Sequence, residues 1–190
     1  NSEADVAGKA LWEIDGNTGD LNHSTPTDPT AYDNIGYTYG VPLIVKVNAG
    51  SGVDALIIGN GYNNNPLGDY QSRLYVIDAA TGQLIHSIKA GTGGTLASPN
   101  GLFNPVAIDT DGNGSADRVY AGDLKGTMWK FDLSSATTTS WTASALHVTS
   151  PAQPITTTPG VALHPNNGYM VTFGTGSMLD TIDTTTSDVH

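Results

Sequence analysis

The apolar residues of this chain fall into short runs separated by turn-forming residues. Three such runs are PLIVKV at 42–47, DALIIG at 54–59 and RLYVID at 73–78. They are rich in β-branched and aromatic residues and are bounded by Gly, Asn and Asp, a pattern typical of strands joined by tight turns. No apolar stripe with a helical period extends over ten or more residues. The pattern therefore predicts an all-β fold.

The runs recur along the chain as an internal repeat. Residues 105–132 align with residues 42–78 when one segment is shifted by 63 positions, and the first half of the alignment needs no gap. The second copy contains PVAI, DRVYAG and TMWKFD in the same order. Each unit thus reads as a strand, a turn, a strand ending in Gly, a short turn and a strand ending in Asp. The matched positions are Pro42 with Pro105, Asp54 with Asp117, Leu56 with Val119 and Gly59 with Gly122.

Partial copies flank these two units. ALWEID, which closes on Asp15, resembles the end of a unit. PGVALHPNNGYMVTFGTG, which starts at Pro159, resembles the beginning of one, with Gly174 in the place of Gly59. We interpret residues 1–190 as one domain. Its expected units are 9–35 (partial), 36–90, 99–158 and 159–190 (partial).

A fourth strand is expected at the end of each unit. QLIHSI at 83–88 follows one closing Asp, and Trp141 and Leu146 in the Ser/Thr/Pro-rich segment 134–158 indicate an outer strand after the other. Four antiparallel strands repeating every ~50 to 60 residues are typical of β-propeller blades. We expect about three to four blades, too few to close a ring comfortably, and hence a piece of a larger propeller. The alternative is a β-sandwich with coincidental similarity, which the gapless 63-residue offset disfavours.

Composition and charge argue against several functional classes, among them nucleic-acid-binding and membrane-spanning proteins. The formal net charge is −11, with only seven Lys and Arg among 190 residues. Such a chain repels nucleic-acid phosphates and anionic lipids, and it suits a hard cation or a basic partner. The absence of Cys excludes disulfides and thiolate metal sites. No apolar run of 18 residues predicts a membrane-spanning segment, and no signal peptide opens the chain, so we expect any export signal to lie outside it.

The stretch DTDGNGSAD at 109–117 is the densest acidic segment. Oxygen-bearing side chains occupy alternate positions, and Gly112 and Gly114 supply unusual backbone angles. The spacing matches the first nine positions of an EF-hand Ca²⁺ loop, in which the seventh position contributes a main-chain carbonyl. Tyr120 stands where an EF-hand has its twelfth-position Glu, and strands instead of helices flank the loop. The predicted ligands are Asp109, Asp111, Asn113, Ser115 through its carbonyl, and Asp117.

The repeat offers an internal comparison for this loop. We expect the sister segment to form the same turn, although only one predicted ligand has an acidic counterpart there. Three crowded carboxylates repel one another unless a cation is present. We therefore predict bound Ca²⁺, with a metal-free turn as the alternative and Mg²⁺ disfavoured by its stricter geometry. The counterparts are Lys46 for Asp109, Asn48 for Asp111, Gly50 for Asn113, Gly52 for Ser115 and Asp54 for Asp117.

Several segments together resemble a known family. In chain order they are NIGYTYGVPLIVKV, ALIIGNGYNNN, RLYVIDAATGQLI, NGLFNPVAIDTDGNGSADRVYAGDLKGTMWKFDLS and VTFGTGSML. The series closely resembles the C-terminal propeller domain of the PilC/PilY family, the type IV pilus biogenesis and tip adhesin proteins, over about residues 9–183. DTDGNGSADRVYAGDLKGTMWKFD is its most specific part, and GNGY at 59–62 is a second marker.

The resemblance implies a fold, a location and a role. The family fold is a modified seven-bladed β-propeller related to quinoprotein propellers. Its members are exported to the bacterial cell surface and the pilus tip, where they cooperate with minor pilins, support pilus assembly and attach to host or abiotic surfaces. One Ca²⁺ in the EF-hand-like loop influences pilus extension and retraction, and the ligand pattern carries over to the five residues named above. The family's adhesive N-terminal region is absent from this chain, so roles tied to it do not transfer.

Two other functional classes remain open. A quinoprotein dehydrogenase would share the blades, but the strong Ca²⁺ loop lies within one hairpin and the vicinal Cys pair of many quinoprotein alcohol dehydrogenases is absent. A Ca²⁺-dependent glycan-binding module could use Tyr62 and Tyr70. The five His residues are scattered without metal-ligand spacing, and no Ser has a convincing His and Asp arrangement. We therefore assign no catalytic residue and expect a binding protein, not an enzyme.

Overall fold

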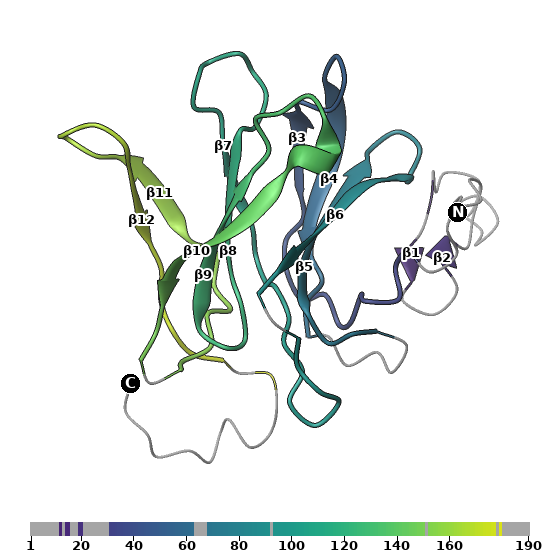
Figure 1. The fold of residues 1–190 in the computed structure, drawn as a ribbon, viewed down its shortest axis with the longest axis vertical. Helices are drawn as coiled ribbons and strands as arrows, with labels where there is room; N and C mark the ends of the chain where they lie inside the picture. Colours follow the sequence, from purple (N-terminus) through teal and green to yellow (C-terminus); the bar gives the residue numbers. More distant parts are fainter. Residues whose placement is uncertain are drawn as a thin grey trace, which may run out of the picture.

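The computed structural model describes residues 12, 14–15, 19–20, 31–62, 68–91, 93–150, 152–177 and 179. In this part of the chain the strands form four antiparallel sheets, and the one helical element is the short 3₁₀ turn η1 (Thr138–Ser140) (Figure 1). The all-β prediction is confirmed. The strands are β1 (Ile14–Asp15), β2 (Gly19–Asp20), β3 (Leu43–Val47), β4 (Val53–Gly59), β5 (Ser72–Asp78), β6 (Leu84–Ala90), β7 (Val106–Ile108), β8 (Arg118–Gly122), β9 (Thr127–Asp132), β10 (Thr142–Val148), β11 (Gly160–Leu163) and β12 (Tyr169–Thr172).

Two of the sheets have the four-stranded meander of a propeller blade. Their orders are β3-β4-β5-β6 and β7-β8-β9-β10, so each strand pairs antiparallel with the next along the chain. All the strands that the sequence predicts for these two units are present, including the outer strands β6 and β10. Figure 1 shows the two sheets beside each other, with the β11-β12 hairpin next to the second.

The flanking units are described in part. Strands β11 and β12 pair from Gly160↔Thr172 to Leu163↔Tyr169, as predicted for the first two strands of a unit. Half of the predicted ALWEID strand lies outside the described residues, but its end forms β1, which pairs with β2. The indole Nε1 of Trp12 donates a hydrogen bond of 3.1 Å to the carbonyl oxygen of Ala79 in the β5–β6 turn.

Central strands of the blades are buried on both faces. Leu74 and Val76 of β5 pack in the cluster between the two four-stranded sheets, whereas Tyr75 and Ile77 pack in a second cluster. Successive side chains of a strand point to opposite faces. Because both faces are covered, β5 reads as a nearly continuous apolar run instead of an alternating one.

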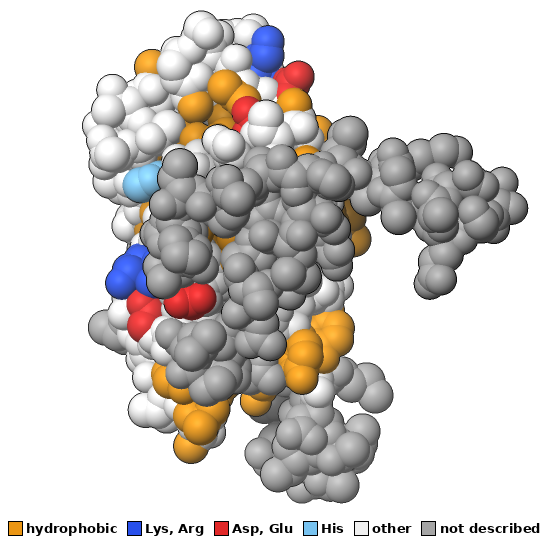
Figure 2. Space-filling view, turned by 90° about the vertical axis from the view of Figure 1, so that its right-hand side faces the viewer, with side chains coloured by type: hydrophobic (Ala, Val, Ile, Leu, Met, Phe, Trp, Pro, Cys, Tyr) orange, Lys and Arg blue, Asp and Glu red, His pale blue; other side chains and the backbone are white. Residues whose placement is uncertain are grey.

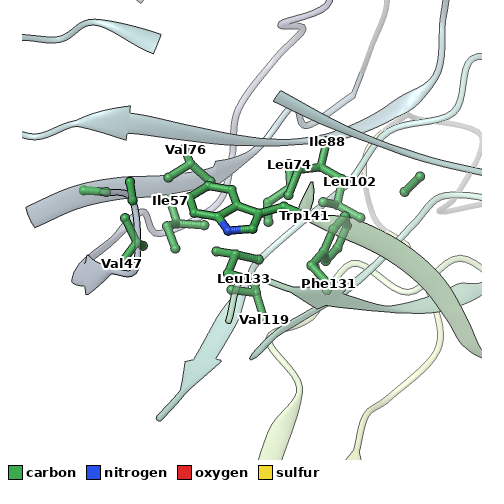
Figure 3. Packing of buried hydrophobic residues seen from close by; sticks show 14 residues of the cluster. Val47, Ile57, Leu74, Val76, Ile88, Leu102, Val119, Phe131, Leu133 and Trp141 are labelled. Atoms are coloured by element: carbon green, nitrogen blue, oxygen red, sulfur yellow. The ribbon is translucent and has the colours of Figure 1, made fainter. Parts of the chain in front are cut away.

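The main core lies between the two blades. Trp141, which follows η1, lies with Ile57 and Val76 of the first sheet and Leu133 beyond the end of β9 (Figure 3). Its indole Nε1 donates a hydrogen bond of 2.8 Å to the carbonyl oxygen of Ser135. The indole is thus both packed and satisfied, so this residue joins the Ser/Thr-rich segment to the core.

The repeated glycines mark the places where the chain passes from one sheet to the next. A Cβ on Gly59 would lie 2.3 Å from the carbonyl oxygen of Leu102, and one on Gly122 would lie 2.3 Å from Cγ2 of Ile155. Leu102 and Ile155 belong to the segments that lead into β7 and β11. Only Gly permits these approaches. Around Gly174, in contrast, the nearest atom to such a Cβ lies 3.8 Å away.

The residue after each of the first two glycines fixes the following turn. Asn60 and Asp123 are both buried and occupy equivalent positions in the repeat. Asn60 Oδ1 accepts a hydrogen bond of 3.0 Å from the backbone N–H of Arg73, and Asp123 Oδ1 accepts one of 2.8 Å from Thr127. The donors open the third strand of each sheet, or follow its first residue. The two units of the repeat therefore share this turn-stabilising hydrogen bond as well as their sequence pattern.

Some apolar side chains remain exposed. Figure 2 shows hydrophobic side chains at the upper and lower ends of the face that lies on the right in Figure 1. Among the described residues the most exposed include Leu163, Val41 and Ile44, at 76%, 72% and 70%. Two of these lie in β11 and β3, the first strands of their sheets. The described residues contain no helix with the length and apolar character required to cross a membrane.

Candidate metal centre

The acidic loop 109–117 connects β7 to β8. The ladder between these strands ends at the pair Ile108↔Arg118. In the sister hairpin the ladder continues two residue pairs further, to Val47↔Val53. The expectation that the two segments form the same turn is therefore wrong. They share the strand register, but the acidic segment opens into a longer loop.

Charge explains this difference. Extending the β7–β8 ladder by one pair would place Asp109 opposite Asp117, because the equivalent pair in the sister hairpin is Lys46↔Asp54. Opposite charges across a ladder stabilise it, whereas like charges directly opposite destabilise it. The acidic segment thus leaves the ladder where this repulsion would begin.

The returning arm of the loop pairs with the neighbouring sheet instead. Ala116 forms a parallel bridge with Val47 of β3. Its backbone N–H donates a hydrogen bond of 2.8 Å to the carbonyl oxygen of Lys46. In Figure 1 this loop and the β3–β4 turn lie at the same end of the molecule. The loop is therefore supported by two blades.

The structure brings three of the predicted ligands together. One carboxylate oxygen from each of Asp109, Asp111 and Asp117 lies within 4.8 Å of the others. Two oxygens bound to the same Ca²⁺ at about 2.4 Å can be at most about 4.8 Å apart, so the spacing fits a shared ion. Among the described residues, these three Asp side chains form the group of His, Cys, Asp or Glu side chains that could hold a metal ion.

Backbone N–H groups converge on Asp109. Its carboxylate accepts hydrogen bonds of 2.7 Å from the N–H groups of both Gly112 and Gly114, and a longer one from Asp111. Both glycines have positive φ, 79° and 88°, which turns their N–H groups inward. The hydrogen bond from Gly114, followed by that from Gly112, holds the pKa of Asp109 below its ordinary value. Asp109 is exposed, so it is ionised at neutral pH in any case, and these hydrogen bonds extend the ionised range to lower pH.

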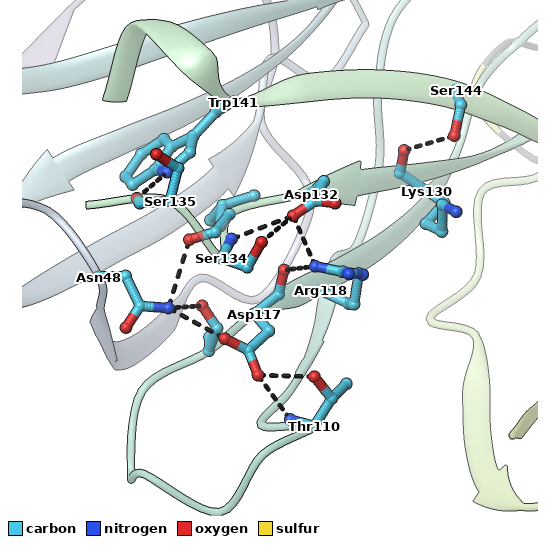
Figure 4. A network of polar contacts seen from close by, with 12 residues as sticks. Asn48, Thr110, Asp117, Arg118, Lys130, Asp132, Ser134, Ser135, Trp141 and Ser144 are labelled. Atoms are coloured by element: carbon cyan, nitrogen blue, oxygen red, sulfur yellow. Dashed lines mark hydrogen bonds and ion pairs between the residues drawn. The ribbon is translucent and has the colours of Figure 1, made fainter. Parts of the chain in front are cut away.

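Asp117 is the buried member of the group. Its Oδ1 accepts a hydrogen bond of 3.0 Å from Asn48 Nδ2, and its Oδ2 accepts bonds of 2.8 and 2.7 Å from the backbone N–H and the hydroxyl of Thr110 (Figure 4). Only 3% of Asp117 is exposed. Burial raises its pKa, but the hydrogen bonds from Thr110 and Asn48 outweigh burial, so the pKa of Asp117 lies below the usual range. The carboxylate is thus held ionised inside the fold.

The two remaining predicted ligands lie within the same loop. Asn113 is exposed, and its Nδ2 donates a hydrogen bond of 2.9 Å to Oδ2 of Asp111. Its Oδ1 accepts one of 2.7 Å from the backbone N–H of Ser115, which is buried. The loop is therefore organised by contacts between alternate residues, as the spacing predicts. An open pocket of about 120 Å³ adjoins it, lined by Lys46 and Asp109 among others.

Sequence reasoning missed two residues of the site. Thr110 lies inside the acidic stretch, but its hydroxyl gave no sign that it holds Asp117. Asn48 lies 69 positions before Asp117, in the turn between β3 and β4 of the neighbouring sheet. No local pattern marks it, because the contact depends on how the blades pack.

The described His residues contact neighbouring aromatic rings or a backbone N–H group. His86 lies edge-on to Trp141 at 6.1 Å between ring centroids, and His147 lies 5.9 Å from Phe173. His164 Nδ1 accepts a hydrogen bond from Asn166, while His23 and His190 lie outside the described residues.

Tyr62 and Tyr70, the candidate glycan-binding residues, and Trp129 of β9 each have a defined place in the structure. Tyr62 forms an isolated bridge with Tyr37, and Tyr70 has a positive φ of 56°. Trp129 donates a hydrogen bond of 2.8 Å to Asp123 Oδ2. The hydrogen bond joins β9 to the turn that follows β8.

Comparisons with known proteins give the same fold. The PilY1 beta-propeller domain family matches residues 2–142. A type IV pilus biogenesis factor PilY1 homolog of Xylella fastidiosa is 36% identical over 177 residues, and PilY1 of Pseudomonas aeruginosa strain PAO1 is 33% identical over 200 residues. The crystal structure of the Pseudomonas aeruginosa PilY1 C-terminal domain superposes with a TM-score of 0.67 at 32% identity.

The matches cover most of this chain but a small part of the relatives. The two PilY1 proteins are matched over 83% and 92% of this chain and over 12% and 16% of their own lengths. The solved domain is matched over 79% of this chain and 34% of its own length. The antiparallel four-stranded blades and the family match together confirm the predicted β-propeller class. This chain belongs to the PilY1 β-propeller domain family.

Proposed function

We propose that this chain is the Ca²⁺-binding β-propeller part of a type IV pilus tip adhesin and assembly factor, which regulates pilus extension and retraction and surface attachment. The observation that carries the proposal is the group formed by Asp109, Asp111 and Asp117 on a blade of PilY1 type. The relatives are named type IV pilus biogenesis factors, which supports a role in pili and favours a binding protein over an enzyme.

The donor set suits Ca²⁺. The proposed ligands are carboxylate, amide and main-chain carbonyl oxygens, the hard donors that Ca²⁺ prefers. Exposed Asp109 is ionised at neutral pH in any case, and hydrogen bonds from the protein keep buried Asp117 ionised, so no proton has to leave either carboxylate before a cation binds. Asn113 and the Ser115 carbonyl complete the proposed set of five residues. Ca²⁺ would supply positive charge that offsets the repulsion among the carboxylates and fixes the loop.

The proposed location and partners follow from the family. We infer that the units of residues 1–190 belong to one larger, seven-bladed propeller that is exported to the cell surface and pilus tip. Minor pilins in the tip complex, and a host or abiotic surface, are the proposed partners. The net charge of −11 argues against nucleic acid as a partner.

Calorimetric titration of the 190-residue chain with Ca²⁺ tests the metal site. We expect one site with a Kd in the micromolar to millimolar range that is typical of extracellular modules. Asp111→Ala should weaken binding at least ~10-fold, because it removes a charged ligand. Asp54→Ala is the matched control, since Asp54 is the acidic counterpart in the sister hairpin and stays paired with Lys46 in the ladder. Binding that is absent from the wild type, or equal in the two variants, would refute the proposed site.

A second test addresses the pilus role. The Asp111→Ala change is placed in the full-length parent protein, and surface pili and twitching motility are measured with and without added Ca²⁺. We expect piliation to lose its dependence on Ca²⁺, whereas Asp54→Ala retains it. Pili and motility that respond to Ca²⁺ normally in the Asp111 variant would contradict the regulatory role.

A further inference from the structure

The two oxygens of Asp117 are used unequally. Oδ2 accepts two hydrogen bonds from Thr110, one from the backbone N–H at 2.8 Å and one from the hydroxyl at 2.7 Å. A carboxylate oxygen has about two acceptor positions, so Oδ2 is fully engaged. Oδ1 accepts one protein hydrogen bond, from Asn48 Nδ2 at 3.0 Å. Oδ1 is therefore the oxygen of Asp117 with room for a cation, and Asn48 is the residue that holds it.

Asn48 reaches Asp117 from a different blade. It follows β3 directly and lies in the β3–β4 turn, whereas Asp117 directly precedes β8. Besides Oδ1, its Nδ2 lies 3.3 Å from the carbonyl oxygen of Leu133 and 3.5 Å from that of Ala116 (Figure 4). One side-chain amide thus contacts the acidic loop and the segment just after β9. Asn48 is half-buried, so its position is set by the packing of the two sheets.

We propose that Asn48 is a positioning residue for the metal centre: it orients Oδ1 of Asp117 toward the ion and thereby couples Ca²⁺ binding to the interface between two blades. This inference rests on the proposed Ca²⁺ function. Residues that hydrogen-bond to a metal ligand fix its direction and strengthen binding although they do not touch the metal. Here the supporting residue belongs to the neighbouring sheet, and the Ala116–Lys46 backbone hydrogen bond ties the same two parts together.

The coupling works in both directions. If the blade interface holds the ligand in place, Ca²⁺ bound by that ligand must stabilise the interface to the same extent. Asn48 is the repeat counterpart of Asp111, so the sister turn contributes to the centre by supporting it and not by binding an ion itself. Ca²⁺ would therefore stabilise the contact between successive blades. An ion bound by a loop whose contacts all lie within one hairpin would not have this effect.

Calorimetry on Asn48→Ala tests the positioning role. We expect the Kd for Ca²⁺ to rise on the order of 10-fold, the usual effect of removing a residue that supports a metal ligand. Asn104→Ala is the matched control. Asn104 is also half-buried and also joins separate segments, accepting a hydrogen bond from Val41 and donating one to Thr156, but it contacts none of the proposed ligands. It should destabilise the fold and leave the Kd unchanged.

A second readout needs no metal. Asn48→Ala, Asp117→Ala and the double variant are unfolded by urea in EDTA. Because both single changes remove the same hydrogen bond, the double variant should be less destabilised than the sum of the singles, whereas Asn104→Ala and Asp117→Ala should add.

Two results would overturn the inference. One is additive behaviour of Asn48 and Asp117 in EDTA. The other is a wild-type Kd in Asn48→Ala. If instead the wild-type chain binds no Ca²⁺ while the two residues remain coupled in EDTA, the contact is real and it is the proposed function that fails.

Discussion

Asp117 and Asp111 are both proposed ligands, but the structure gives them different roles in the fold, and this difference can be measured without metal. Asp117 is 3% exposed and accepts three hydrogen bonds from Asn48 and Thr110. Asp111 is exposed, and its carboxylate accepts hydrogen bonds from Asn113 alone among the contacts within the described loop. Replacing each by Ala in EDTA therefore separates structural support from metal binding.

The expected loss of stability in Asp117→Ala depends on the hydrogen-bond donors that are left without an acceptor. The amide of Asn48 keeps its contacts with two carbonyl oxygens, but the N–H and hydroxyl of Thr110 lose their acceptor. A hydrogen bond to a charged group contributes about 1.5–3 kcal/mol, and the losses from one side chain are not additive. We expect the free energy of unfolding to fall by about 2–3 kcal/mol. Asp111→Ala, at the surface, should change it by less than ~0.5 kcal/mol.

Urea denaturation followed by tryptophan fluorescence measures both values. With a slope of about 2 kcal/mol per molar urea, Asp117→Ala should lower the midpoint by about 1–1.5 M in EDTA, and Asp111→Ala should leave it nearly unchanged. Adding Ca²⁺ should raise the urea midpoint of the wild type, and it should raise the midpoint of each variant by less. If the two variants had equal midpoints in EDTA, the assignment of Asp117 as a buried, hydrogen-bonded support of the loop would be refuted.

Two further predictions concern the fold and pH. Gly59→Ala should destabilise the chain by about 1–3 kcal/mol, because its Cβ would lie 2.3 and 2.5 Å from the carbonyl oxygens of Leu102 and Phe103. Gly174→Ala, where no atom lies so near, should cost less than ~0.5 kcal/mol. Equal thermal midpoints of the two variants would contradict the close approach at Gly59. Burial lowers the pKa of His86, so its contribution to stability is present above the unfolded-state pKa of about 6.5 and is lost as pH falls through the folded pKa. His86→Gln should make the thermal midpoint depend less on pH between about pH 8 and pH 5. A variant whose midpoint falls with pH as steeply as that of the wild type would count against this role of His86.

The sequence by itself determined the strands, their order and the repeat. Runs such as RLYVID are short and apolar on both faces, which fits a strand covered on both sides, and β5 is such a strand. It also determined where the carboxylates lie along the chain. Alternate spacing and two glycines are local properties, and a nine-residue loop can express them without distant contacts.

The tertiary structure alone decided how the loop is held. From the repeat, the two hairpins look alike, yet one ladder continues to Val47↔Val53 and the other stops at Ile108↔Arg118. The choice depends on charges that face each other only once the strands have paired. The support of Asp117 by Asn48 depends on the packing of two sheets across 69 positions of sequence. Periodicity reports which face of a strand is buried, but it carries no information about which side chain of the next blade will meet it.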